Sequence, residues 1–162
     1  MIITLTWAEV LLAAQVGCMR NVQCLENEWH DRSGDPTNTW TRNIEGTCGE
    51  MAVAKWLNVY WSGNVGDLNA ADVGDLEVKT NTSRRWDDLM IQRENRTDRN
   101  YVSVLSFLPR FKICGWITGA EGKQDKYWRE GKPGQPCYFV PRSDLHPLTT
   151  LPLPWWHEGT PT

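Results

Sequence analysis

The segment from Asp72 to Lys79, which reads DVGDLEVK, combines acidic and basic residues at a spacing that suits metal-dependent chemistry. If Gly74-Asp75 forms a two-residue turn, Asp72 lies opposite Glu77 on the paired strand. Because side chains alternate along a strand, Lys79 then joins these two carboxylates on one face. Like charges that face each other are destabilising unless a cation lies between them, and Mg²⁺ suits one or two carboxylates completed by water and phosphate. The segment therefore predicts a Mg²⁺ or Mn²⁺ site on a β-hairpin at about 68–81.

A plainer interpretation of the same residues is an exposed hairpin. Glu77 and Lys79 on one strand face often form only a weak surface ion pair. Asp75 is also a rival of Asp72, because it shares parity with Glu77 if the strand begins earlier and the turn is shifted. The sequence leaves the choice between Asp72 and Asp75 open.

Glu50 is a candidate for a third acidic group. It lies in a segment, 49–61, whose apolar residues at 53, 56, 57 and 60 follow helical spacing. We expect Glu50 in the first turn of this helix, where the helix dipole favours a carboxylate. Simple charge compensation is therefore one role for Glu50, and participation in the metal site is the other.

Glu50, Asp72 and the triplet Glu77-Val78-Lys79 resemble the motif of the PD-(D/E)XK nuclease superfamily, which has the restriction-endonuclease-like fold. That motif is a helix-borne glutamate, an aspartate at a strand end and (Asp/Glu)-x-Lys on the next strand. The run from Gly46 to about Leu148 is also similar to short nuclease-like proteins encoded by phages. One departure is Ala71, which stands where a proline often precedes the aspartate.

The resemblance implies a metal-dependent deoxyribonuclease with Glu50, Asp72, Glu77 and Lys79 as its catalytic residues. Asp72 and Glu77 would hold Mg²⁺ or Mn²⁺, joined by the carbonyl of Val78 and, directly or through water, by Glu50. The ion would generate the nucleophile and neutralise charge on the phosphate. Lys79 would position or help to deprotonate the attacking water and stabilise developing negative charge.

DNA is the partner that this function requires. Arg84, Arg85 and Trp86 follow the expected catalytic strand, and an aromatic residue beside basic residues can stack on unpaired bases. An ordinary solvated turn is the alternative for this triplet. The net charge of −3 does not favour a polyanionic partner, although basic residues cluster after residue 84. Many members of the superfamily act as dimers, so a homodimer is an expectation that the sequence leaves open.

The remaining elements follow from periodicity and capping signals. Thr6 and Glu9 form a capping-box pattern, so a first helix should begin near residue 7 and continue toward residue 25. Helices followed by a mostly antiparallel meander predict an α+β fold, with a central mixed or antiparallel sheet flanked by helices. After the hairpin we expect strands at 88–93, 101–107 and 111–118, a loop at 119–136 and a short strand at 138–141.

Length and composition predict one nuclease-like domain over 1–146. The chain has 162 residues, of which 40% are hydrophobic and 23% charged. Residues 147–162 form a tail rich in proline and tryptophan, for which the proline density argues against regular structure. Four of the ten tryptophans fall within predicted helices or strands and are expected in the core: Trp7, Trp56, Trp61 and Trp116.

The cysteines and the hydropathy pattern indicate in which cellular compartment the protein is expected. Five cysteines without a Cys-x-x-Cys pair, and only three histidines, argue against a structural zinc or iron–sulfur site and fit a reducing compartment. The sequence contains no run of about 20 apolar residues that would cross a membrane. We therefore expect a cytoplasmic protein, in the host cell if the chain is phage-encoded.

Three functions follow from these patterns. The first is the metal-dependent nuclease, and the second is a non-catalytic phage protein on the same scaffold that binds nucleic acid or a host factor. The third is an unrelated α+β domain in which the hairpin is surface decoration. The intact acidic set favours the first, because a binding protein has no need to retain it.

Overall fold

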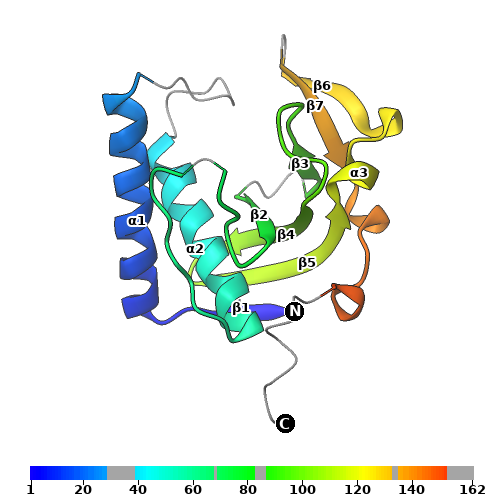
Figure 1. Cartoon of the computed structure of the whole chain (residues 1–162). Coiled ribbons are helices and arrows are strands. Elements are labelled where there is room, and N and C mark those ends of the chain that lie inside the picture. The colour runs from blue at the N-terminus through cyan, green and yellow to red at the C-terminus, as the bar shows by residue number, and fades with distance from the viewer. Residues whose placement is uncertain (29–38, 68, 83–86, 133–134, 153–162) are drawn as a thin grey trace.

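Helix α1 (Trp7–Glu26) begins where the capping signal places it. The Thr6 side chain accepts a hydrogen bond from the Glu9 backbone N–H, and the Glu9 carboxylate accepts one from the Thr6 N–H at 2.6 Å. The computed structural model describes residues 1–28, 39–67, 69–82, 87–132 and 135–152 (Figure 1).

Helix α2 (Thr39–Leu57) packs against α1, and a glycine permits the close contact. A Cβ atom on Gly17 would lie 2.7 Å from Ile44 Cα, so only glycine fits at this crossing. The expected helix at 49–61 is wrong at both ends, since α2 begins ten residues earlier and stops at Leu57. Asn58 follows with φ of 54°, a left-handed conformation that commonly ends helices.

The helices cover a four-stranded sheet whose order is β1-β5-β4-β2. Strands β1 (Ile2–Thr4), β4 (Asn100–Phe107) and β5 (Arg110–Thr118) pair in antiparallel fashion, whereas β2 (Leu76–Asn81) is parallel to β4. The predicted α+β fold with a mixed sheet is confirmed, although the mostly antiparallel meander does not extend to β2. The chain between β2 and β4 makes a long crossover instead of a hairpin, which is what a parallel pair requires.

The expected hairpin at 68–81 is present only at its tip. Val73 and Leu76 form an isolated antiparallel bridge across the turn Gly74-Asp75, and Gly74 has φ of 58°. Positive φ at the first central position belongs to the type II′ turn that the sequence indicates. The strand before the turn does not extend beyond this bridge.

A second sheet occupies the far end of the long strands β4 and β5 (Figure 1). It is antiparallel and has the order β3-β7-β6, with β3 (Leu89–Ile91), β6 (Trp128–Lys132) and β7 (Gln135–Val140). The loop expected at 119–136 is thus wrong, because it contains the short helix α3 (Gly119–Gly122) and β6. The sequence of β6, WREGK, lacks the apolar alternation by which a strand is recognised.

Two hydrophobic clusters hold these layers together. The larger lies between the helices and one face of the first sheet, and the smaller joins Tyr101 and Ile117 on the other face to the second sheet. Trp116 is buried in the larger cluster, and Trp56 and Trp61 pack half-buried against it. Trp7 is 70% exposed, so its expected place in the core is wrong.

The C-terminal segment packs on the domain up to the point that the structure describes. Leu148–Thr150 is a single 3₁₀ turn, and Leu151 is buried in the larger cluster. Trp155 and Trp156 lie outside the described residues. All five cysteines are free. Within the described chain, no helix is both long and apolar enough to span a membrane.

Candidate active site

Asp72 is fixed at the open edge of β2 by a backbone contact. Its Oδ2 accepts a hydrogen bond of 2.7 Å from the N–H of Val78. The N–H and C=O of one strand residue point to the same side, so the Val78 carbonyl also faces away from β4. Asp75 is exposed on the turn. This geometry favours Asp72 over Asp75 as the carboxylate that accompanies the Glu77-Val78-Lys79 triplet.

Glu77 and Lys79 share the face of β2 that points away from the helices. Lys79 Nζ lies 3.7 Å from Glu77 Oε2 and 5.6 Å from the centroid of the Tyr101 ring. Burial and the nearby Asp72 carboxylate raise the pKa of Glu77, and Lys79 opposes that rise. Both side chains are partly exposed, at 16% for Glu77 and 29% for Lys79, so solvent and ligands reach them.

Glu50 lies in the middle of α2, not in its first turn. Compensation of the helix dipole is therefore wrong as an explanation of this residue. Glu50 is 4% exposed, and Arg20 donates to both of its oxygens, from Nη1 to Oε1 at 2.5 Å and from Nη2 to Oε2 at 2.9 Å. Trp61 Nε1 adds a third hydrogen bond at 3.2 Å. Burial and the Asp72 charge raise the pKa of Glu50 to about 7, against the lowering effect of Arg20.

Arg20 is a residue that the motif analysis does not identify. It projects from α1, and its Nε donates to the backbone carbonyl of Asn64 at 2.8 Å. Arg20 thus ties α1 to α2 and to the segment that leads into the turn at Gly74. One signal for it exists in the sequence, since Arg20 is the only basic residue between Trp7 and Glu26.

Asp72 is the electrostatic neighbour that Glu50 and Glu77 have in common. Its charge raises the pKa of each, although Glu50 lies on the helix side of the sheet and Glu77 on the opposite face. In the part of the chain that the structure describes, no three acidic, histidine or cysteine side chains form a group that could hold a metal ion by themselves. The two carboxylates that act on each other at the edge of β2 are Asp72 and Glu77.

A described cation lies close to this pair. Arg99 lowers the pKa of Glu77, and its Nη2 donates to the carbonyl of Asn69 at 3.1 Å. The structure thereby brings to the site one of the basic residues that cluster after residue 84 in the sequence. The expected DNA-binding triplet of Arg84, Arg85 and Trp86 lies outside the described residues.

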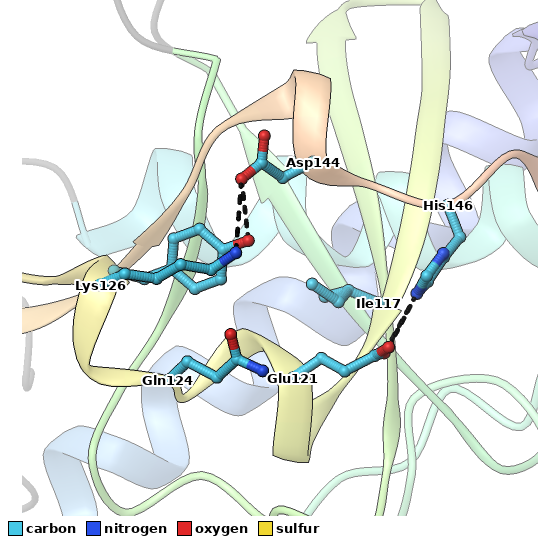
Figure 2. A pocket seen from close by; sticks show the side chains of 7 residues that line it. Ile117, Glu121, Gln124, Lys126, Asp144 and His146 are labelled. Atoms are coloured by element: carbon cyan, nitrogen blue, oxygen red, sulfur yellow. Dashed lines mark hydrogen bonds and ion pairs between the residues drawn. The ribbon is translucent and has the colours of Figure 1, made fainter.

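A separate pocket of about 300 Å³ lies where α3 meets the first sheet (Figure 2). Its polar groups are paired with one another: His146 Nε2 lies 3.1 Å from Glu121 Oε2, and the Tyr127 hydroxyl donates to Asp144 at 2.9 Å. None of the motif residues lines this pocket. It is therefore distinct from the site at the edge of β2.

Comparisons with protein-family models, with curated proteins and with solved structures gave no match for this chain. The resemblance to the PD-(D/E)XK superfamily therefore rests on the motif residues alone.

Proposed function

We propose that this protein is a Mg²⁺- or Mn²⁺-dependent deoxyribonuclease with a PD-(D/E)XK-type site and a restriction-endonuclease-like core. One observation carries the proposal: the bond from Val78 N–H to Asp72 brings the aspartate of the motif to the strand that holds Glu77 and Lys79. Surface decoration would leave these side chains free in solvent. Instead, Asp72 is half-buried and perturbs the carboxylates on both sides of it.

The donor chemistry fits a hard divalent cation. Asp72 and Glu77 would hold it, with the outward-facing Val78 carbonyl as a third oxygen. Mg²⁺ needs only one or two protein carboxylates when water and substrate phosphate complete its shell. A cation would also relieve the repulsion that raises the pKa of Glu77. When bound, the ion supplies charge neutralisation at the phosphate and an acidified water molecule.

The chain's own residues supply the rest of the chemistry. Lys79 lies beside Glu77 and is 29% exposed, so its ammonium group can contact a scissile phosphate or the attacking water. Arg99, whose charge also acts on Glu77, offers a contact to an adjacent phosphate. Arg20, which holds Glu50 in place, also attracts the Asp72 carboxylate from the helix side.

The engagement of Glu50 favours a second candidate function. Both of its oxygens are occupied by Arg20, as in a structural ion pair. A non-catalytic phage protein that binds nucleic acid or a host factor would keep such a pair for stability alone. This alternative predicts DNA binding without cleavage and no affinity for Mn²⁺.

Cleavage assays on a small set of DNA substrates test the proposal. Supercoiled plasmid, linear duplex, single strand, flap and four-way junction would be incubated with Mg²⁺, Mn²⁺ or EDTA. We expect metal-dependent cutting that Glu77→Gln, Lys79→Ala and Asp72→Asn each reduce by about a hundredfold or more. Asp75→Asn is the matched control, because Asp75 is exposed on the same turn, and it should keep full activity.

One further measurement distinguishes the two candidate functions. Calorimetric titration of Mn²⁺ should show binding to the wild type that Asp72→Asn weakens. Absence of cutting on every substrate, together with absence of Mn²⁺ binding, would refute the nuclease and favour the binding protein.

A further inference from the structure

The outer face of α1 is apolar, although it faces solvent. A helix that packs with one face on a core normally carries polar residues on the opposite face. α1 buries Ala13, Gly17 and Asn21 against the molecule and lies at the periphery, beside α2 (Figure 1). The opposite face presents large apolar side chains that are 43–70% exposed: Trp7, Leu11, Leu12, Met19, Val22 and Leu25.

The residues of this face repeat with the period of a coiled coil. From Ala8 to Leu25, residues of this face follow one another at alternating steps of three and four. Each of three successive heptads thus contributes two positions to one stripe along the helix. Leu12 and Met19 flank these positions on one side. No charged residue occupies them. We call these six residues the α1 seam: Ala8, Leu11, Gln15, Cys18, Val22 and Leu25.

The area of this face matches one half of a protein–protein interface. At roughly 100 Å² apiece, the six exposed apolar side chains present about 600 Å², the upper end of the largest patch on a typical monomer. Ala8, Gln15 and Cys18 extend it toward the ~800 Å² that each partner contributes to a standard interface. A groove of about 390 Å³ beside the seam, lined in part by Met19, Val22 and Val65, can receive side chains of a second helix.

We propose that two copies of this chain pair through the α1 seam, with the helices antiparallel. An uncharged seam does not suit DNA or a charged peptide, whereas it complements itself. Antiparallel pairing opposes the helix dipoles and sets the small Ala8 against the partner's Leu25, while parallel pairing would bring Glu26 close to the partner's Glu26. The three facing pairs are Ala8 with the partner's Leu25, Leu11 with the partner's Val22, and Gln15 with the partner's Cys18.

The oligomeric state of the full chain tests this surface. Sedimentation equilibrium over a range of concentrations should give a dimer for the wild type. Leu11→Glu with Val22→Glu should weaken association by more than about a hundredfold, because each copy would bury unpaired charges. Met90→Glu is the matched control, since Met90 is 50% exposed on β3 of the second sheet, and it should leave the dimer intact. Circular dichroism would verify that the variants fold, as expected for substitutions at exposed positions.

Two outcomes of that experiment would overturn the proposal. A wild type that is monomeric at every concentration would mean that another partner or another part of the chain covers the face. A dimer that persists in the double glutamate variant would mean that the copies associate elsewhere.

A charge exchange tests the orientation. Leu11→Lys combined with Val22→Glu in one chain brings opposite charges together across an antiparallel seam, but like charges together across a parallel one. We expect this variant to associate more tightly than the double glutamate variant, and more weakly as salt is raised. Equal or weaker association would overturn the antiparallel arrangement.

Discussion

At the scale of single residues, Glu50 carries its carboxylate where water scarcely reaches. A buried charge is costly unless a partner compensates it, and losing the partner is more damaging than never having had the pair. Arg20 donates to both carboxylate oxygens and Trp61 donates to one of them. Glu50 is therefore a stability residue as well as a candidate catalytic residue, and measurement can separate the two roles.

Removal of the arginine tests the stability role. Arg20→Met should lower the free energy of unfolding by about 3 kcal/mol, because Glu50 would remain buried without its main partner. Arg20→Lys should fall between that variant and the wild type, because an ammonium group cannot fork to two oxygens. Urea denaturation measures both.

The double variant is the control for that prediction. Arg20→Met with Glu50→Gln removes the orphaned charge and should recover most of the loss. Equal stability of Arg20→Met and the wild type would contradict the importance of the pair.

The raised pKa of Glu50 predicts a pH dependence with a definite sign. Burial and the Asp72 charge raise this pKa from its ordinary 4.5 to about 7 in the folded state. The folded protein then binds the proton more tightly than the unfolded chain, so the contribution of Glu50 to stability is full below about pH 4.5 and is lost as pH rises to about 7. Urea denaturation across this range should show that decline in the wild type and a shallower one in Glu50→Gln. Identical slopes would show that Glu50 does not titrate in this window.

At the scale of elements, the contact between α2 and β2 sets the distance between the two halves of the site. A Cβ on Gly49 would lie 2.0 Å from Thr80 Oγ1 and 3.0 Å from Thr80 Cβ. Glu50 follows Gly49 on the helix, and Lys79 precedes Thr80 on the strand. This glycine therefore determines how closely the helix-borne carboxylate approaches the strand that carries the triplet.

Substitution of this glycine should separate the two elements. Gly49→Ala is expected to cost about 1–3 kcal/mol, since the helix or the strand must shift to admit a methyl group. Gly46→Ala on the same helix is the control, because no atom lies within 4 Å of its Cβ position, and it should stabilise by about 0.5–1 kcal/mol through helix propensity. Thermal or urea unfolding distinguishes them, and two equal effects would contradict the close contact.

Local signals in the sequence predict local structure well here. The capping box fixes the start of α1, Gly74 fixes the two-residue turn, and apolar residues mark β4 and β5. The features that these local signals do not predict are contacts between residues far apart in the chain. The parallel pairing of β2 with β4 and the joining of β3 to β7 across about 45 residues leave no local pattern.

The residues of the candidate site also fall into those that local signals predict and those that depend on long-range packing. The motif identifies Asp72, Glu77 and Lys79, and the geometry brings these three to one strand edge. Spacing places Glu50 on a helix but in the wrong turn of it, because the first half of α2 lacks a clear apolar stripe. The motif does not identify Arg20, because its bond to Glu50 forms only when α1 packs on α2.

At the scale of the whole molecule, β2 is an edge strand with its outer side turned away from the sheet. Exposed strand edges invite pairing with other chains. In this protein the Val78 N–H donates to Asp72, so the carboxylate that we propose as a metal ligand also blocks one edge position. Pairing through α1 would leave this edge free in both copies, because the seam lies on the far side of α1 from the core.

Arg20 also determines in which states of the chain the candidate site is assembled. Its bonds reach across 30 residues to Glu50 and across 44 residues to Asn64. Such contacts cost loop-closure entropy, so they are absent from any state in which α1 is not packed on α2. A chain still emerging from the ribosome, or one that has opened locally, carries Glu50 without its arginine and Asp72 without its helix-side neighbour. Any chemistry that depends on the paired Glu50 is therefore confined to the state in which α1 and α2 are packed together.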